Sequence, residues 1–171
     1  PATGANDLSV SEYVITALLL LLRRAWFASE QVIAGQWPRM STIGREASGK
    51  RLGLVGLGAI ARETAQRARA LGMQIAAFDP HLPATHAAWT NVDRMSLAEL
   101  LSSSDVVSLH VPLTPETHHL INAGALAGMA PHAILVNAAR GGVVDELALV
   151  AALRAGTLGG AALDVFETEP L

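Results

Sequence analysis

Residues 51–61 read RLGLVGLGAIA, an apolar run of strand length followed by a G-x-G-x-x-A pattern. Gly56 permits a tight turn, and Gly58, which has no Cβ, lets the main chain approach a ligand closely. The small side chain of Ala61 lets the helix that begins here pack closely on the strand. The N-terminus of this helix presents free N–H groups and the positive end of a dipole, which favour a dianion without any Lys or Arg. The stretch therefore predicts a strand, a turn and a helix that together bind a pyrophosphate.

A second strand is predicted over residues 74–78, and it ends in Asp79. The separation of Asp79 from Gly56 is close to the roughly 20 residues typical of an acid that binds the adenosine ribose hydroxyls. Such a carboxylate would repel a 2′-phosphate, and Pro80 and His81 supply no Arg to bind one. A plain turn at Asp79 is the alternative. The order of strand, glycine turn, helix, strand and acid predicts NAD rather than NADP.

The rest of the chain alternates between apolar runs of strand length and helical segments. Strands are predicted over residues 52–55, 74–78, 106–110, 134–137 and 161–163. Helices are predicted over residues 60–71, after a capping box at 96–99, and over 146–154 before a glycine. Strands that are apolar throughout are typical of a parallel sheet covered on both faces. The fold class is therefore α/β, a Rossmann-type doubly wound parallel sheet in three layers (α/β/α), forming a single domain preceded by a long helix.

That preceding helix is predicted from Val10 to about Gly35, because Ser9 and Glu12 form a capping-box pattern. It contains the run Leu18 to Leu22, which is too short for the roughly 20 apolar residues of a membrane span. The positive charges follow this run instead of preceding it, so it is not a signal peptide either. An ordinary core helix is one interpretation, and a dimer contact is the other. We assign residues 1–40 to this helix and a linker, within the same domain as the dinucleotide-binding residues 41–171.

Composition excludes several classes of protein. The chain has 171 residues, of which 51% are hydrophobic and 16% charged, so it is folded and of a length that suits one domain. Its formal net charge of −3 argues against a nucleic-acid partner. The absence of cysteine excludes disulfides and a cysteine nucleophile, and no H-E-x-x-H pattern occurs, so we expect no metal site.

Polar clusters follow three of the predicted strands, where an open α/β sheet places its ligand crevice. They read SLHVPLTPETHHLIN over residues 108–122, LVNAARGGVVDELAL over 135–149 and ALDVFETEPL over 162–171. Together with the glycine turn, these stretches resemble the cofactor-binding domain of the D-isomer-specific 2-hydroxyacid dehydrogenases over nearly the whole chain. The resemblance implies a cytoplasmic, NAD-dependent oxidoreductase that transfers a hydride between NAD(H) and a 2-hydroxy or 2-keto acid. It also implies a homodimer formed through the Val10–Gly35 helix.

The resemblance also implies roles for individual residues. Arg140 matches an arginine that holds the substrate carboxylate bidentately and polarises the keto group, with a structural salt bridge as the alternative. Glu169, rather than the nearby Glu167, matches an acid that orients a catalytic histidine and raises its pKa. Asp164 matches a residue that contacts the nicotinamide carboxamide. The cofactor-binding positions are Gly56, Gly58, Ala59, Ile60, Asp79, His110, Val111, Pro112, Thr117, Ala138, Ala139, Arg140 and Asp164.

Two departures from the family pattern limit these expectations. Ala59 stands where many members carry an arginine, so one side-chain contact to the pyrophosphate is missing. The family places its catalytic histidine about twenty residues beyond the acid matched by Glu169, and no position here matches it. We therefore expect the substrate domain and a C-terminal return segment to lie outside this chain, and the chain alone to be nearly inactive. The alternatives are an NAD-sensing, corepressor-like binding module or a relative that uses another donor, such as phosphite.

Overall fold

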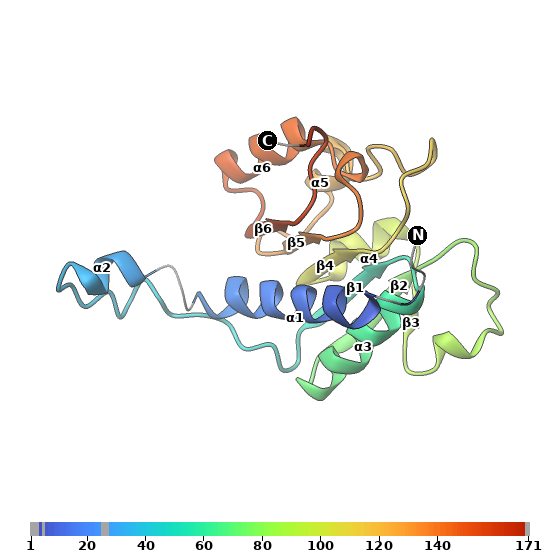
Figure 1. Ribbon diagram of the computed structural model, residues 1–171, viewed down its shortest axis with the longest axis horizontal. Coiled ribbons are helices and arrows are strands. Elements are labelled where there is room, and N and C mark those ends of the chain that lie inside the picture. Colours follow the sequence, from blue (N-terminus) through green and yellow to red (C-terminus); the bar gives the residue numbers. More distant parts are fainter. Residues whose placement is uncertain (1–3, 5, 25–27, 170–171) are drawn as a thin grey trace.

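The computed structural model describes residue 4, residues 6–24 and residues 28–169. Within this part of the chain, six parallel strands form one sheet in the order β3-β2-β1-β4-β5-β6 (Figure 1). The strands are β1 (Arg51–Val55), β2 (Gln74–Phe78), β3 (Asp93–Arg94), β4 (Val106–Leu109), β5 (Ile134–Asn137) and β6 (Gly160–Leu163). This strand order is that of the doubly wound dinucleotide-binding fold. The predicted fold class is confirmed.

Helices cover both faces of the sheet. They are α1 (Asp7–Arg23), α2 (Ser29–Ile33), α3 (Ala59–Ala70), α4 (Leu97–Ser103), α5 (Ala123–Ala127) and α6 (Glu146–Ala155), with short 3₁₀ helices η1 (Ala87–Trp89) and η2 (Gly141–Val143). One apolar cluster joins α1 and α3 to the sheet, and a second joins α4, α5 and α6 to the other face. Neighbouring residues of β5 divide between the two, since Ile134 and Val136 belong to the first cluster and Leu135 to the second. Strands buried on both faces explain why the strand sequences are apolar throughout.

Local signals place most element ends correctly. Ser96 and Glu99 form the predicted capping box at the start of α4, with both reciprocal hydrogen bonds present. Gly156 ends α6 in the left-handed conformation, as the sequence predicts. The elements that sequence analysis missed are the two-residue strand β3 and the five-residue helix α5. Both are too short to show a hydrophobic period.

The prediction of one helix from Val10 to Gly35 is wrong. Helix α1 begins at Asp7 and ends at Arg23, because Arg24 adopts φ 54° and its N–H bonds to the Leu20 carbonyl. The pair Ser9 and Glu12 therefore lies inside α1 and makes no cap there, since the cap position is Asn6 and has no side-chain bond. The short helix α2 follows, and residues 25–27 lie outside the described part of the chain.

One face of α1 is buried by the domain itself. Val14 and Leu18 are 0% exposed and Leu22 is 1% exposed, and all three belong to the apolar cluster between α1, α3 and the sheet. The core-helix interpretation is therefore correct for this face. Residues 19–21 are partly exposed, so the contact of a partner chain with the leucine run stays a prediction. None of the described helices combines the length and the apolar character that crossing a bilayer requires.

Candidate functional site

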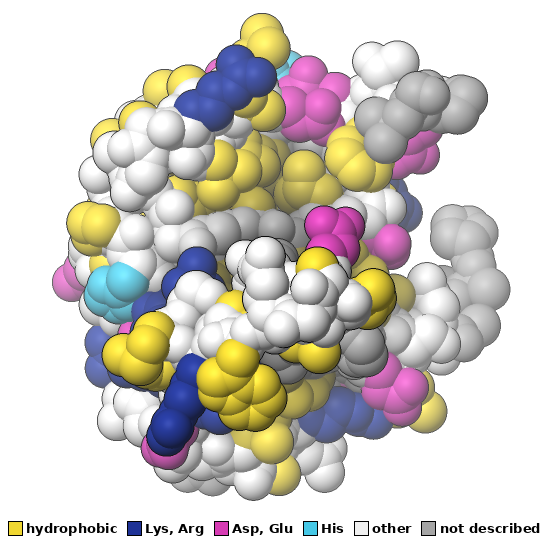
Figure 2. All heavy atoms as spheres, turned by 90° about the vertical axis from the view of Figure 1, so that its left-hand side faces the viewer, with side chains coloured by type: hydrophobic (Ala, Val, Ile, Leu, Met, Phe, Trp, Pro, Cys, Tyr) yellow, Lys and Arg dark blue, Asp and Glu magenta, His cyan; other side chains and the backbone are white. Residues whose placement is uncertain are grey.

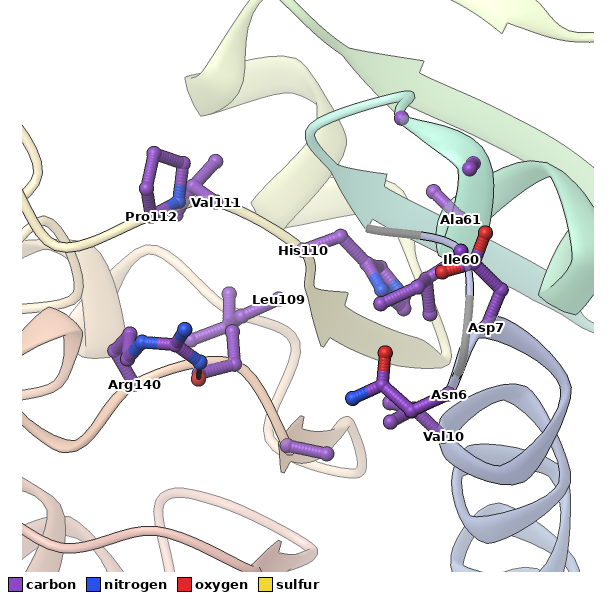
Figure 3. A pocket seen from close by; sticks show the side chains of 15 residues that line it. Asn6, Asp7, Val10, Ile60, Ala61, Leu109, His110, Val111, Pro112 and Arg140 are labelled. Carbon is purple, nitrogen blue, oxygen red and sulfur yellow. Dashed lines mark hydrogen bonds between the residues drawn. The ribbon is translucent and has the colours of Figure 1, made fainter. Parts of the chain in front are cut away.

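The carboxyl ends of β1, β4 and β5 meet the N-termini of α1 and α3 around a crevice of about 640 Å³. Figure 3 shows the Arg140 side chain on one side of this space, with Asn6 and the His110 ring across from it. We call it the main crevice. Its lining residues are Gly4, Asn6, Asp7, Val10, Gly58, Ala59, Ile60, Ala61, Leu109, His110, Val111, Pro112, Ala138, Ala139 and Arg140. Because the sheet order reverses between β1 and β4, the crevice lies where doubly wound folds bind their ligands.

The N-terminus of α3 fits a pyrophosphate. Within the described residues, the N–H groups of Ala59, Ile60 and Ala61 donate to no acceptor, and the first bond of the helix runs from the Arg62 N–H to the Gly58 carbonyl. A Cβ built on Gly58 would meet nothing within 4 Å, so its side of the turn is open to a ligand. Gly56 has φ 90°, and a Cβ there would lie 2.7 Å from the His110 carbonyl oxygen. Three free donors at the positive end of a helix dipole suit a dianionic group.

Asp79 lies behind this turn at the end of β2. Its Oδ2 accepts the Leu57 N–H at 2.9 Å, and its Oδ1 accepts the N–H groups of His81 and Leu82 at 2.9 and 3.1 Å. These bonds tie the carboxylate to the glycine turn and fix its orientation. A carboxylate oxygen can accept two hydrogen bonds, so Oδ2 retains capacity for a ribose hydroxyl. Asp79 is not part of the lining of the main crevice.

His110 directs a neutral ring into the main crevice. Its Nε2 lies 3.0 Å from the Ser108 Oγ, and burial lowers the pKa of its imidazole to about 4. The ring therefore adds no charge to the crevice near neutral pH.

Arg140 connects the main crevice to a second one, which we call the adjacent pocket. It is lined by Leu113, His118, Arg140, Gly141, Gly142, Val165, Phe166, Glu167, Thr168 and Glu169. The Arg140 Nη1 donates to the Ala139 carbonyl at 2.6 Å, and no described carboxylate lies within salt-bridge distance of its guanidinium. The structural salt bridge weighed for Arg140 is thus absent from the described residues. Its planar, doubly donating group remains open to a carboxylate ligand.

The two acids of the closing stretch have different surroundings. Glu167 Oε1 accepts the Glu146 N–H at 3.1 Å and lies 3.0 Å from His119 Nε2, and the Glu167 N–H donates to Glu146 Oε1 at 2.6 Å. Glu167 is therefore committed to holding its loop on the start of α6. Glu169 accepts a single described bond, from the Phe166 N–H at 2.9 Å, and its side chain faces the adjacent pocket with Arg140. The geometry favours Glu169 over Glu167 as the acid available for chemistry.

Gly56, Thr117 and Asp164 also lie outside both linings. The Thr117 hydroxyl donates to the Pro112 carbonyl at 2.6 Å and accepts the Thr114 N–H, so it shapes the loop after β4. The Asp164 N–H donates to the Asn137 carbonyl at 2.9 Å. Burial and, secondarily, the Asp164 charge raise the pKa of Tyr13 on α1. Asp164 therefore lies near α1.

Sequence analysis missed the contribution of the start of α1 and of the residues just before it. Gly4, Asn6, Asp7 and Val10 line the main crevice, and the Asn6 amide extends into it (Figure 3). Because the helix was expected to start at Val10, the three lining residues before it, Gly4, Asn6 and Asp7, were not considered. Among the described residues, no group of three or more acidic or histidine side chains could hold a metal ion.

Comparisons with known proteins point to one family. A model of the NAD-binding domain of D-isomer specific 2-hydroxyacid dehydrogenases matches residues 15–171. The chain is 56% identical to the (S)-sulfolactate dehydrogenase of Chromohalobacter salexigens and 43% identical to the D-3-phosphoglycerate dehydrogenase of Bacillus subtilis. These matches cover 100% and 99% of this chain, and 56% and 32% of the two relatives. The chain thus spans about half of one relative and about a third of the other.

A solved structure is also similar to this chain. The NAD-dependent formate dehydrogenase of Staphylococcus aureus, in complex with NAD, superposes with a TM-score of 0.89 at 35% identity. The match covers 98% of this chain and 52% of that one.

Proposed function

Because the chain belongs to the D-isomer specific 2-hydroxyacid dehydrogenases, as their NAD-binding domain, we propose that its parent protein interconverts a 2-hydroxy acid and a 2-keto acid. The observation that carries this proposal is the position of Arg140, which lines both the main crevice and the pocket that contains Glu169. A carboxylate bound by Arg140 would therefore lie between the cofactor-binding residues and the acid.

The main crevice and the nearby Asp79 would hold different parts of NAD. The free N–H groups of Ala59, Ile60 and Ala61 would bind the pyrophosphate, and Asp79 would accept a hydrogen bond from a ribose hydroxyl. Val111, Pro112, Ala138 and Ala139 provide apolar and main-chain contact along the crevice. NAD(H), when bound, supplies or accepts the hydride.

Arg140 and Glu169 act on the substrate side. The Arg140 guanidinium binds the substrate carboxylate bidentately, and its charge polarises the neighbouring keto oxygen. Glu169 holds a protonated histidine in position, so that the keto oxygen receives a proton as it becomes a hydroxyl. None of the histidines at 81, 86, 110, 118, 119 and 132 bonds to Glu169. We therefore propose that the histidine lies outside residues 1–171, and that these residues alone turn over little substrate.

Two of the relatives suggest a class of substrate. Sulfolactate and 3-phosphoglycerate are both 2-hydroxy acids that carry a second acidic group on carbon 3. We propose that the substrate of this protein also carries such a group.

An apolar segment outside the core suggests a second copy of the chain as partner. Val32, Ile33, Trp37, Met40 and Ile43 are between 53% and 86% exposed, and they lie in and after α2, which stands away from the sheet (Figure 1). We call residues 29–43 the apolar arm. Figure 2, which views the molecule from the α2 side, shows exposed hydrophobic side chains on this face. A patch of this kind is uncommon on a monomer. We propose a homodimer through this arm, and a cytoplasmic location where NAD is available.

A steady-state assay of the full-length protein tests the proposed function. We expect NADH oxidation with at least one of glyoxylate, pyruvate, 3-sulfopyruvate and 3-phosphohydroxypyruvate. Arg140→Lys should lower kcat/KM by about tenfold or more, because an ammonium cannot reproduce the bidentate fork. Arg154→Lys, in the last turn of α6, is the matched control and should retain wild-type activity. Peptide binding without turnover of any acid would contradict the proposal and favour the binding module.

A further inference from the structure

His118 is a polar side chain of the adjacent pocket to which the proposed mechanism gives no task. Its main-chain N–H bonds to the Thr114 carbonyl, whereas its imidazole makes no hydrogen bond to any described residue. The side chain nevertheless lines the same pocket as Arg140 and Glu169. An exposed imidazole without a protein partner beside these two residues can serve a ligand.

The ring of His118 is held in place by packing. It stacks on the His119 ring with centroids 4.0 Å apart and an interplanar angle of 22°. His119 in turn is fixed by Glu167, whose Oε1 lies 3.0 Å from its Nε2. A Cβ built on Gly142 would lie 3.6 Å from the His118 Cδ2, so the ring rests against the turn that follows Arg140. Such support orients a side chain before any ligand binds.

Charge determines which ligand group suits this position. Arg140 binds one carboxylate in the proposed function, while Glu167 and Glu169 repel any further anion. Among the described lining residues of the pocket, His118 and Thr168 are the side chains besides Arg140 that can donate to an anion, and of these two only His118 can also carry a positive charge. An imidazole donates an N–H in either protonation state. A second acidic group would therefore be accepted next to His118 and opposed near the two acids.

We propose that His118 binds the tetrahedral acidic group on carbon 3 of the substrate and thereby selects substrates that carry one. This inference rests on the proposed function, since it assigns a residue to one part of the proposed substrate. Sulfonate and phosphate are both tetrahedral anions that an imidazole N–H could bind. A sulfonate substrate and a phosphate substrate, assayed separately, show which of the two groups is preferred.

The test compares substrates within each variant of the full-length protein. NADH oxidation is measured with 3-sulfopyruvate, 3-phosphohydroxypyruvate and pyruvate, whose carbon 3 is an uncharged methyl group. In His118→Leu, we expect kcat/KM to fall by about tenfold or more for the preferred acidic substrate, mainly through KM, because a bond to a charged group is lost. We expect little change for pyruvate. His118→Gln keeps an N–H donor and should retain part of the preference.

His132→Leu is the matched control, because this exposed imidazole lies beside Asp105, outside both linings. His132→Leu should leave the ratio of kcat/KM for the preferred acidic substrate to kcat/KM for pyruvate unchanged. Equal losses on pyruvate and on the acidic substrate in both His118 variants would overturn the inference. A wild-type protein that prefers pyruvate over both acidic substrates would overturn it together with the proposed second acidic group, while the proposed interconversion of a 2-hydroxy acid and a 2-keto acid would stand. If no 2-keto acid were reduced, the proposed function would fail together with the inference.

Discussion

Single residues carry most of the chemistry that the sequence predicts here. Gly58, Arg140 and Glu169 were identified from motif positions, and each lines one or both of the two pockets. Asn6 and His118 were not identified as site residues, because neither stands in a position with a recognisable spacing. Their contribution arises from tertiary structure, which brings the start of α1 and the loop after β4 to the same edge of the sheet.

Asp79 should determine the choice between NAD and NADP. Asp79→Ser removes the charge that repels a 2′-phosphate, and it keeps a hydroxyl that can accept the Leu57 N–H. We expect NAD affinity to fall about tenfold and the preference for NAD over NADP to shrink, as measured by titration of the two dinucleotides. A wild-type protein that prefers NADP would contradict the assignment of Asp79.

His110 should make the folded protein less stable as the pH falls below 6.5. Burial lowers its pKa in the folded protein to about 4 from an ordinary value of 6.5, so the unfolded chain binds the proton more readily. This contribution is fully present above pH 6.5 and is lost as the pH falls from 6.5 towards 4. Urea unfolding at pH 7.5 and pH 5 should show a smaller stability difference in His110→Gln than in wild type. An imidazole NMR titration of His110 with its midpoint near 6.5 would contradict this account.

Among the elements, the turn between β1 and α3 depends most strictly on its sequence. Gly56→Ala places a Cβ 2.7 Å from the His110 carbonyl at φ 90°, so the turn must shift. Gly156→Ala is the matched control, since its φ is 68° but nothing lies within 4 Å of the added Cβ. In both variants the free energy of unfolding should fall by about 1 kcal/mol, because alanine is less stable than glycine in the left-handed conformation. Only Gly56→Ala should also lose NAD affinity, by isothermal titration. Equal NAD affinity in the two variants would contradict the role of this turn.

The sequence predicted elements well where a capping residue and a hydrophobic period coincide, and poorly where they do not. The start of α4 follows from the capping box at Ser96, and the end of α6 follows from Gly156. The break after α1 could not be predicted, because Arg24 adopts a left-handed conformation that is uncommon for a residue other than glycine. The sequence therefore suggested a helix that continues to Gly35, longer than the one that forms.

At the scale of the whole molecule, the apolar arm should govern assembly. Ile33 and Trp37 are 86% and 84% exposed, so replacing both by serine removes apolar surface without disturbing the core. In sedimentation velocity at micromolar concentration, we expect a wild-type dimer and a monomeric double variant. Leu147→Ser is the matched control, because Leu147 is 84% exposed on α6, outside the arm, and its substitution should leave the dimer intact. A monomeric wild type, or dissociation by the control alone, would contradict the arm interface.

The central claim is that the main crevice holds NAD and that Arg140 connects it to the substrate. A crystal structure of the full-length protein with NAD and oxamate, an unreactive analogue of a 2-keto acid, tests this claim most directly. We predict pyrophosphate oxygens on the N–H groups of Ala59, Ile60 and Ala61, a ribose hydroxyl on Asp79, and the oxamate carboxylate on the Arg140 guanidinium. A dinucleotide bound elsewhere, or an oxamate with no contact to Arg140, would contradict it.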